Sequence, residues 1–341
     1  NGTANLITSN KWMRAGYGEK LRKYLATETN PQELIDVGPN VFAKATVDTN
    51  ILMFEKSNTT ENNLRAVALK EHNELKELQT SDFVRMPNIS GKAWLILSEK
   101  QQSIQAKIVE KGTPLKDWNL KIYRGILTGY NKAFIIDGDK KEELIAADAK
   151  NEKIIKPILR GRDVQKYTAE FADCWLIATF PAKNINIDKF PILKTYLETF
   201  LPKIKQTGET FVENGTTIYT RKKTSNKWFE TQDQIAYFKE FEKPKIVWKR
   251  IGSQIRFSYS RKKEYALDST VIATGKRLKY LTALLNSKLY VNQLLINAPK
   301  TGTGDAIISV QALNPLFVYV PSDEEEKPVS YTHLTLPTIG E

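Results

Sequence analysis

The sequence predicts an α+β fold, and three local patterns carry this prediction. Residues 1–56 follow a strand, helix, strand, strand order, residues 121–137 have the pattern of a β-hairpin, and residues 221–263 alternate aromatic with basic side chains as a strand does. A chain of 341 residues, 41% of them hydrophobic, is long enough for two domains that each bury a core.

The first 56 residues contain one predicted helix among three predicted strands. Apolar runs predict strands over residues 4–8, 33–37 and 48–54, and residues 18–26 are predicted to form a helix with basic side chains on one face. Because many α/β proteins share this order, the pattern by itself leaves the kind of fold open.

Residues 57–111 are predicted to form a helical connector. Residues 64–78 have a weakly apolar helical period. Ser90 is placed to cap a second helix, whose apolar face would begin at Trp94 and which Gly112 would end. We expect this segment to space and pack the parts on either side of it.

The sequence KIYRGILTGYNKAFIID, residues 121–137, is predicted to form a β-hairpin. Apolar and aromatic residues alternate from Ile122 to Leu127, TGYN supplies turn residues that tolerate positive φ, and residues 133–136 return as the second strand. Asp137 and Gly138 would form the exit turn.

Further elements are expected between residue 139 and residue 320. They are a strand over residues 175–178, a helix over residues 191–205 that starts at its proline, an apolar helix over residues 278–295, and a short helix and strand that end near Tyr319. In the apolar helix, Asn286 and Lys288 are expected to have local structural roles.

The net charge of +12 is unevenly distributed. Residues 322–341 hold one lysine and five acids, which leaves 50 basic and 34 acidic side chains, a balance of +16, in residues 1–321. Such an excess predicts a polyanionic partner, although solubility alone tolerates it and a membrane surface would also attract it.

Two segments concentrate the basic residues. In the first, Arg160, Arg162 and Lys166 follow an apolar run in a loop-like setting suited to phosphates or guanine edges. The alternative is a surface charge cluster with an internal pair between one of these arginines and Asp163.

The second segment, residues 221–263, holds 13 lysines and arginines against 4 acids, with aromatic residues between them. Strand alternation within it would bury Ile246, Trp248, Ile255 and Phe257 and turn Lys245, Lys249, Arg250 and Arg256 outward. The candidate nucleic-acid contacts here are Arg221, Lys222, Lys223, Lys249 and Arg250. Base stacking by the aromatic residues is the alternative to a core role for them.

Cysteine and histidine are too scarce for a disulfide framework or a histidine-cysteine metal site. Cys174 is the single cysteine and there are two histidines, so we predict no disulfide, no metal and a reducing, cytoplasmic location. No apolar run approaches a membrane span and no signal peptide opens the chain, which begins mid-pattern as a fragment would.

Several motifs in consistent order resemble one family. GI-TG-NKAF-ID in the predicted hairpin, KPILRGRD, NKWFE, FEKPKIVW and LLNSKL are similar to the TaqI-like specificity domain, which reads DNA in many adenine-N6 DNA methyltransferases and type IIG restriction-modification enzymes of the Eco57I-like kind. ITSNKWMRAGYGEKLRKYL and VFAKATVDTNILMFEK resemble the end of the catalytic domain of the same enzymes.

This resemblance implies a division into four parts. Residues 1–56 would be the C-terminal remnant of a Rossmann-like methyltransferase sheet, 57–111 the helical connector, 112–321 a mixed α/β specificity domain, and 322–341 an acidic linker with a non-native tail. The tail is set apart because VSYTHLTLPT resembles translated vector sequence.

The resemblance also implies an activity for the intact protein. It would be a site-specific adenine-N6 DNA methyltransferase of a restriction-modification or phage-defence system, with or without a fused nuclease. Such an enzyme transfers a methyl group from S-adenosylmethionine to an adenine flipped out of double-stranded DNA. Phe42 matches the position where family members place an aromatic ring against that adenine.

The chain itself is expected to supply no catalytic residue and to bind no cofactor. The family's glycine-bearing cofactor turn and NPPY-like tetrapeptide are not found, and AGYG, TGTG and NPLF are poor substitutes in the wrong places. A missing N-terminal catalytic part, or a partner chain, would therefore have to supply them.

Two other classes of function are weighed against this one. A non-enzymatic specificity subunit, similar to those of type I systems, would also bind DNA, but it would have no use for the SNKWMRAGYGEK segment. A divalent-metal nuclease could use the acids of EFEK, residues 240–243, which more simply lie on a solvated helix.

Overall fold

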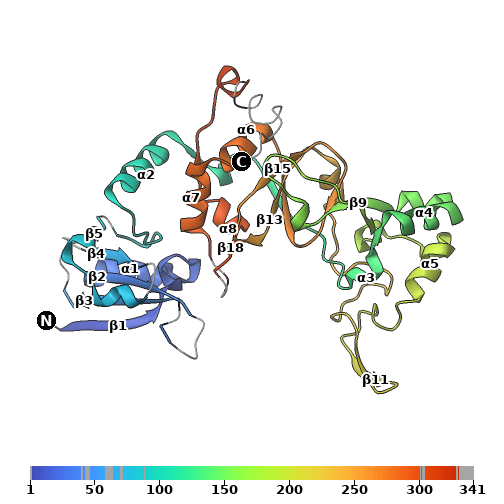
Figure 1. Cartoon of the computed structure of the whole chain (residues 1–341), viewed down its shortest axis with the longest axis horizontal. Helices are drawn as coiled ribbons and strands as arrows, with labels where there is room; N and C mark the ends of the chain where they lie inside the picture. Colours follow the sequence, from blue (N-terminus) through green and yellow to red (C-terminus); the bar gives the residue numbers. More distant parts are fainter. Residues whose placement is uncertain are drawn as a thin grey trace. The chain divides into compact units, whose positions relative to one another are not determined.

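The computed structural model describes residues 2–39, 41–42, 47–57, 64–69, 72–87, 89–299, 301, 304–327 and 329. The chain forms two compact units (Figure 1). The first comprises Asn1–Leu115 and Asn292–Val320, and the second comprises Lys116–Val291 and Pro321–Glu341. These units cut the chain at places other than the sequence-based domain boundaries, which stay a prediction.

The first unit is built on a five-stranded sheet of order β1-β3-β2-β4-β5. Its strands are β1 (Thr3–Ser9), β2 (Asn30–Gly38), β3 (Thr49–Glu55), β4 (Arg65–Ala68) and β5 (Val84–Arg85). β2 and β4 are parallel, and the other neighbours are antiparallel. The three strands predicted in residues 1–56 are confirmed, as is the helix, α1 (Glu19–Glu28).

The AGYG sequence before α1 forms a tightly packed turn. A Cβ on Gly18 would lie 2.1 Å from the backbone oxygen of Trp12, so only glycine fits there. The buried guanidinium of Arg22 donates to the carbonyl oxygens of Trp12, Ala15 and Gly91, which ties the turn to the following loop. Gly18 therefore serves close packing.

The predicted helix over residues 64–78 is wrong. This segment contains β4 and a short 3₁₀ helix, His72–Lys76. The buried side chains of Ala66 and Val67 explain the difference, because β4 gains a neighbour on each side by pairing with β2 and β5.

The second predicted helix of the connector begins later than expected. α2 (Glu99–Lys111) is capped by Ser98, whose side chain accepts from the backbone N–H of Gln101, and it ends at Gly112 as predicted. Trp94 lies in the preceding loop and packs edge-on against Trp12, with 5.3 Å between ring centroids.

The second unit contains two four-stranded sheets, of order β16-β9-β10-β8 and β15-β13-β17-β7. Their strands are β7 (Lys121–Arg124), β8 (Ile135–Asp137), β9 (Ile155–Leu159), β10 (Cys174–Ile177), β13 (Lys245–Lys249), β15 (Phe257–Ser260), β16 (Tyr265–Ala266) and β17 (Thr270–Thr274). One apolar core includes residues from both sheets, among them Ile136, Leu176, Val247 and Ile272.

The predicted β-hairpin over residues 121–137 is wrong, because its two strands belong to different sheets. β7 pairs with β17 and β8 pairs with β10. Between them Gly125 passes so close to the chain at Leu267 that a Cβ would lie 1.9 Å from its carbonyl oxygen. The sequence NKAF forms a helical turn, α3 (Asn131–Phe134).

The helices of the second unit depart from expectation mainly at their ends. Asp137 does not form an exit turn but caps α4 (Gly138–Ala147), and α5 (Pro191–Glu198) starts at the predicted proline and ends earlier than predicted. The apolar helix is divided into α6 (Leu278–Leu285) and α7 (Lys288–Asn297). At the break, the Asn286 amide pairs with the backbone N–H and C=O of Phe257 on β15, which is a local structural role.

The remaining elements are short. They are β6 (Thr113–Pro114), β11 (Thr210–Glu213), β12 (Thr216–Tyr219), β14 (Ile251–Gly252), β18 (Ala306–Ile307), α8 (Val310–Leu313) and β19 (Phe317–Val318). α8 and β19 confirm the predicted final helix and strand.

Lys245 is buried in the core and does not face outward as the strand pattern predicted. β13 lies between β15 and β17, and its residues 245–248 are all buried. The Lys245 Nζ donates to the carbonyl oxygens of Phe241 at 2.8 Å and Lys262 at 2.7 Å. Burial lowers the pKa of Lys245 to about 8, partly opposed by the charge of Glu264.

Lys245 predicts a pH dependence of stability. Its pKa is about 8 in the folded chain and near 10.5 when unfolded, so between these values the unfolded chain holds the extra proton and stability rises with pH. Relative to Lys245→Met, the wild type should gain roughly 2 kcal/mol in unfolding free energy from pH 7 to pH 10, at about 1.4 kcal/mol per titrated unit. Urea unfolding of both proteins at pH 7, 8.5 and 10 measures this gain. If the difference in unfolding free energy between the wild type and Lys245→Met were the same at all three pH values, the Lys245 ammonium would not be desolvated.

Candidate nucleic-acid interface

The loops that follow β9 and β13 are held together by one residue, Ser269. The backbone N–H of Gly161 donates to the Ser269 hydroxyl at 3.0 Å, and the backbone N–H of Arg250 donates to the Ser269 carbonyl at 2.9 Å. A Cβ on Gly161 would lie 3.1 Å from Cγ of Lys249. Residues about 90 positions apart in the sequence are thereby brought side by side.

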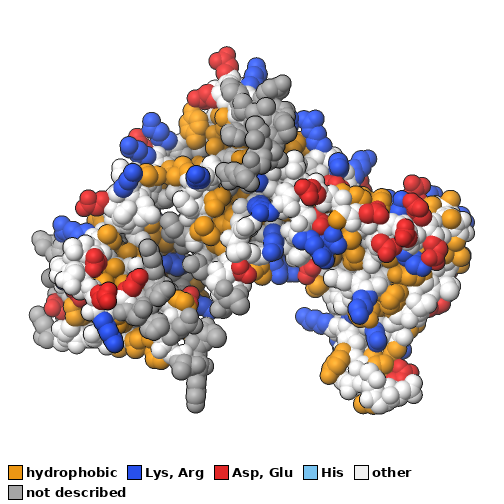
Figure 2. All heavy atoms as spheres, viewed as in Figure 1, with side chains coloured by type: hydrophobic (Ala, Val, Ile, Leu, Met, Phe, Trp, Pro, Cys, Tyr) orange, Lys and Arg blue, Asp and Glu red, His pale blue; other side chains and the backbone are white. Residues whose placement is uncertain are grey.

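This contact gathers a set of cations that we call the β9–β13 basic cluster. Its members are Arg160, Arg162, Lys166, Lys249, Arg250 and Arg256. Arg162, Lys166 and Lys249 are exposed, and the others are partly buried. Lysine and arginine side chains gather over the β13 region in Figure 2.

A second set of contacts fixes the loop after β9 along β15. The Ser258 hydroxyl donates to the carbonyls of Gln165 and Thr168, and Tyr167 exchanges backbone hydrogen bonds with Phe257 and Tyr259. The Arg256 guanidinium donates to the Gln165 side chain. Lys166 is therefore presented from an anchored backbone.

Arg160 is committed to an internal ion pair, as one of the two sequence-based interpretations expected. Its guanidinium donates to both oxygens of Asp163, with 2.9 Å between Nη2 and Oδ1, and Asp163 is buried. These hydrogen bonds raise the pKa of Arg160 above its ordinary value. The pair shapes the turn that presents Arg162.

Arg250 has capacity for a further hydrogen bond. Its Nε is buried and has no hydrogen-bond partner among the described residues. A buried donor without a partner is unfavourable, and an anion that reached this guanidinium would satisfy it.

Arg221 requires a correction, because its burial removes it from the candidate contacts. Only 4% of the residue is exposed, and its guanidinium donates to the carbonyl oxygens of Thr128, Ile204, Trp228 and Glu230 at 2.6–2.8 Å. It also lies 5.1 Å from the centre of the Phe134 ring. Burial lowers the pKa of Arg221 to about 10, opposed by the charge of Glu230.

Lys222 and Lys223 are exposed, as a contact role needs, on the segment that follows β12. The Lys222 carbonyl accepts from the Gln232 side chain, and Lys223 packs against Gly208. These two lysines belong to a different surface segment from the β9–β13 basic cluster.

Phe42 lies after β2 and is 47% exposed. This exposure is too high for a core residue. Its neighbours at 40 and 43–46 lie outside the described residues.

Lys183 is a cation in an unusual aromatic environment that sequence reasoning did not select. Its Nζ lies 5.0 Å from the Phe180 ring, 5.1 Å from the Phe238 ring and 5.9 Å from the Tyr265 ring. Burial, reinforced by the charge of Lys156, lowers its pKa to about 8. The three rings come from segments that are distant in the sequence, so no local sequence pattern predicts that they surround Lys183.

The acids of EFEK have separate structural partners. Glu240 accepts from Thr274 and Lys243, and Glu242 accepts from the Tyr265 hydroxyl. Across the described residues, no group of three or more histidine, cysteine, aspartate or glutamate side chains could hold a metal ion. The same part of the chain has no helix long and apolar enough to cross a membrane.

Comparisons with known proteins bear on both ends of the chain. Residues 156–301 match the TaqI-like C-terminal specificity domain, and residues 1–42 match the Eco57I restriction-modification methylase. The chain is 23% identical over 270 residues to the Type II methyltransferase M.BstVI of Geobacillus stearothermophilus, which covers 72% of this chain and 45% of that protein. The chain is therefore similar to restriction-modification methylases at these two segments. The family resemblance seen in the sequence is thereby confirmed.

One of the solved structures that match, that of MmeI, shares the fold. The Type IIL restriction-modification enzyme MmeI, solved in complex with DNA, matches with a TM-score of 0.58 at 10% identity, over 97% of this chain and 41% of that one. The type IIG restriction endonuclease BpuSI matches with a TM-score of 0.45 at 11% identity, over 98% and 42%. The chain spans less than half the length of these relatives. The β9–β13 basic cluster lies within the segment that matches the specificity domain.

Mutations of the neighbouring residues Arg221 and Lys222 should differ strongly in their effect on stability. Arg221→Ala should lower the unfolding free energy by on the order of 3 kcal/mol, because the carbonyl oxygens of Ile204 and Trp228 lose the donor that the guanidinium supplies. Lys222→Ala should change it by less than about 0.5 kcal/mol, because that side chain is exposed. Urea unfolding tests both, and equal effects would contradict the assigned structural role of Arg221.

Proposed function

We propose that this chain is the DNA-recognition part of a site-specific adenine-N6 DNA methyltransferase from a restriction-modification or related phage-defence system. The observation that carries the proposal is the β9–β13 basic cluster within the segment that matches the specificity domain. Exposed lysines suit the phosphates of double-stranded DNA, and arginines suit phosphates as well as guanine edges. Ser269 and Ser258 hold the loops rigidly enough to give these contacts a fixed register.

In the intact enzyme the target is an adenine turned out of the duplex, because N6 is beyond reach within the base stack. We assign Phe42 to hold that base. Its exposed ring can contact an extruded adenine and offset part of the unstacking cost, by about 0.5–1.5 kcal/mol.

S-adenosylmethionine would supply the methyl group in the intact enzyme, but the described residues of this chain do not fit it. The space beside Gly18 is filled by the backbone of Trp12, and the Ala15 carbonyl of the AGYG turn accepts from Arg22. The other glycine-rich sequence, TGTG, includes residues 302 and 303, which lie outside the described residues. We propose that another part of the intact protein binds the cofactor.

We further propose that the first-unit sheet ends a larger Rossmann-like sheet. β1 is an edge strand, and its Leu6 and Ile7 are each 48% exposed. An apolar edge strand favours pairing with a further strand. The catalytic part of the intact protein, or a partner chain, would supply it.

A type I-like specificity subunit that only recruits catalytic partners is the second candidate. It would use the same basic cluster. The match of residues 1–42 to a methylase favours the methyltransferase instead.

The β9–β13 basic cluster predicts strongly salt-dependent binding to duplex DNA. The variant Arg162→Gln, Lys166→Gln, Lys249→Gln, Arg250→Gln should lower the slope of log affinity against log salt by up to about 3.6, since each lost phosphate contact removes about 0.9. Fluorescence anisotropy with a labelled random-sequence duplex at several salt concentrations measures the slope.

The matched control removes four exposed lysines outside the cluster, Lys132, Lys150, Lys153 and Lys189, by the same change to glutamine. It tests whether net charge alone sets the slope. Equal decreases of the salt slope in the two variants would contradict the assigned interface.

Phe42→Ala tests the proposed base contact. In the intact enzyme the variant should methylate up to roughly tenfold more slowly, since about 0.5–1.5 kcal/mol of contact is lost, with little change in thermal stability because the ring is half exposed. Single-turnover methylation and thermal unfolding are the two measurements. A methylation rate equal to that of the wild type would contradict the contact.

A further inference from the structure

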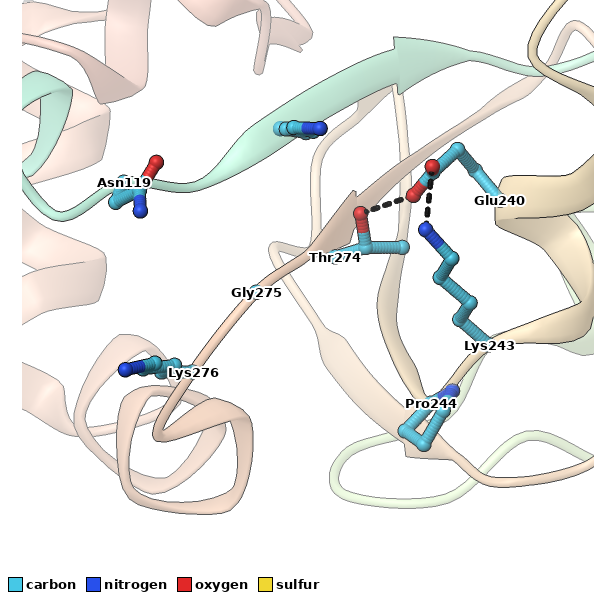
Figure 3. Close-up of a pocket in the computed structure, with 8 residues that line it drawn as sticks. Asn119, Glu240, Lys243, Pro244, Thr274, Gly275 and Lys276 are labelled. Carbon is cyan, nitrogen blue, oxygen red and sulfur yellow. Dashed lines mark hydrogen bonds and ion pairs between the residues drawn. The ribbon is translucent and has the colours of Figure 1, made fainter.

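A second basic site lies at the other end of β13. Three lysines, Lys121, Lys243 and Lys276, line a pocket of about 340 Å³ together with Asn119, Glu240, Pro244, Thr274 and Gly275 (Figure 3). The walls come from three separate segments: the start of β7, the end of β17, and the turn that leads into β13. All of them belong to the second unit.

The pocket carries net positive charge that is only partly neutralised within the chain. Glu240 accepts from Lys243 Nζ and from the Thr274 hydroxyl, each at 2.7 Å, and Figure 3 shows it between these two partners. Lys121 and Lys276 are exposed and make no ion pair with any described residue. Figure 3 shows Lys276 pointing away from the Glu240 carboxylate.

The electrostatics of Glu240 reflect this surplus. Burial alone would raise its pKa, but hydrogen bonds from Lys243 and Thr274 and the charges of Lys243 and Lys121 lower it below its ordinary value. The carboxylate is therefore an anion held among cations, at a place where a second anion could also be stabilised.

An adjoining pocket of the second unit already pairs a cation with carboxylates of the chain. It shares Pro244 and Gly275 with the lysine pocket. In it the Arg277 guanidinium binds two carboxylates of the chain itself, Asp323 at 2.9 Å and Glu326. The lysine pocket has three lysines but only one carboxylate, that of Glu240, among its lining residues.

We propose that the lysine pocket of Lys121, Lys243 and Lys276 binds a phosphate of a nucleic-acid backbone, as a second contact separate from the β9–β13 basic cluster. This inference rests on the proposed function for its ligand. Pro244 precedes β13 and Lys249 ends it, so the two residues are five steps apart along the strand, roughly 16 Å at about 3.3 Å per residue. That separation corresponds to roughly five base steps of a duplex at about 3.4 Å each, so one nucleic acid is long enough to reach both.

The test measures duplex binding by the full chain. Lys121→Gln with Lys276→Gln should lower the salt slope by about 1–2, at about 0.9 per phosphate contact. Lys276→Arg with Lys121 unchanged should retain the wild-type slope, because the charge is kept. The matched control, Lys239→Gln with Lys263→Gln, removes two exposed lysines that do not line the pocket and should leave the slope nearly unchanged.

Glu240→Gln provides a gain-of-function arm. It removes the competing carboxylate while keeping an oxygen that can accept from Thr274, so duplex binding should tighten a few-fold. A purely structural role for Glu240 would give no tightening. Weaker binding without loss of stability would overturn the proposal.

The remaining outcomes separate this proposal from the proposed function. If the lysine-pocket variant behaves like its control while the cluster variant still loses slope, the pocket proposal fails and the proposed function stands. If neither variant changes the slope, both fail. Phosphorus NMR titration with inorganic phosphate identifies the source of the ligand: a pocket variant that loses phosphate binding but keeps duplex binding would mark a free-anion site and overturn the nucleic-acid assignment.

Discussion

Backbone hydrogen bonds of residues 265–270 join the two sheets of the second unit, and the candidate interface depends on them. Leu267 donates to Leu159 at the end of β9, and Ile126 donates to Ala266. Two residues later Ser269 binds the loops that carry Arg162 and Arg250, and at Thr270 the chain enters β17 of the other sheet. The positions of Arg162 and Arg250 therefore depend on the path of residues 265–270 between the two sheets. They do not follow from a local basic motif.

The sequence could predict individual strands and helices but not how the strands pair. Strands β1, β2 and β3 and helix α1 were predicted correctly. The spacing of apolar residues that marks a strand or a helix lies within the element itself, so it can be recognised from the sequence. Strand pairing is not local. β7 and β8 look like two arms of a hairpin, yet their partners are β17 and β10, and the crossing at Gly125 is decided by Leu267, more than 140 residues away.

Charged side chains show the same limit at the level of single residues. Arg162, Lys166 and Lys249 were named from the sequence and are exposed, whereas Arg221 and Lys245 looked equivalent and are buried. The acceptors of Arg221 and Lys245 are backbone carbonyl oxygens, which every residue has and which no sequence pattern marks. The lysine pocket was missed for a related reason, since its lysines come from three segments that are brought together only by sheet pairing.

The central claim is that the second unit contacts DNA through the loops after β9 and β13. Photo-crosslinking of the full chain to a duplex that carries photoreactive bases, followed by mass spectrometry of the linked peptides, tests it most directly. The account predicts crosslinks in residues 160–168 and 249–256. Crosslinks confined to the first-unit sheet, or to the surface of α4 and α5, would contradict it.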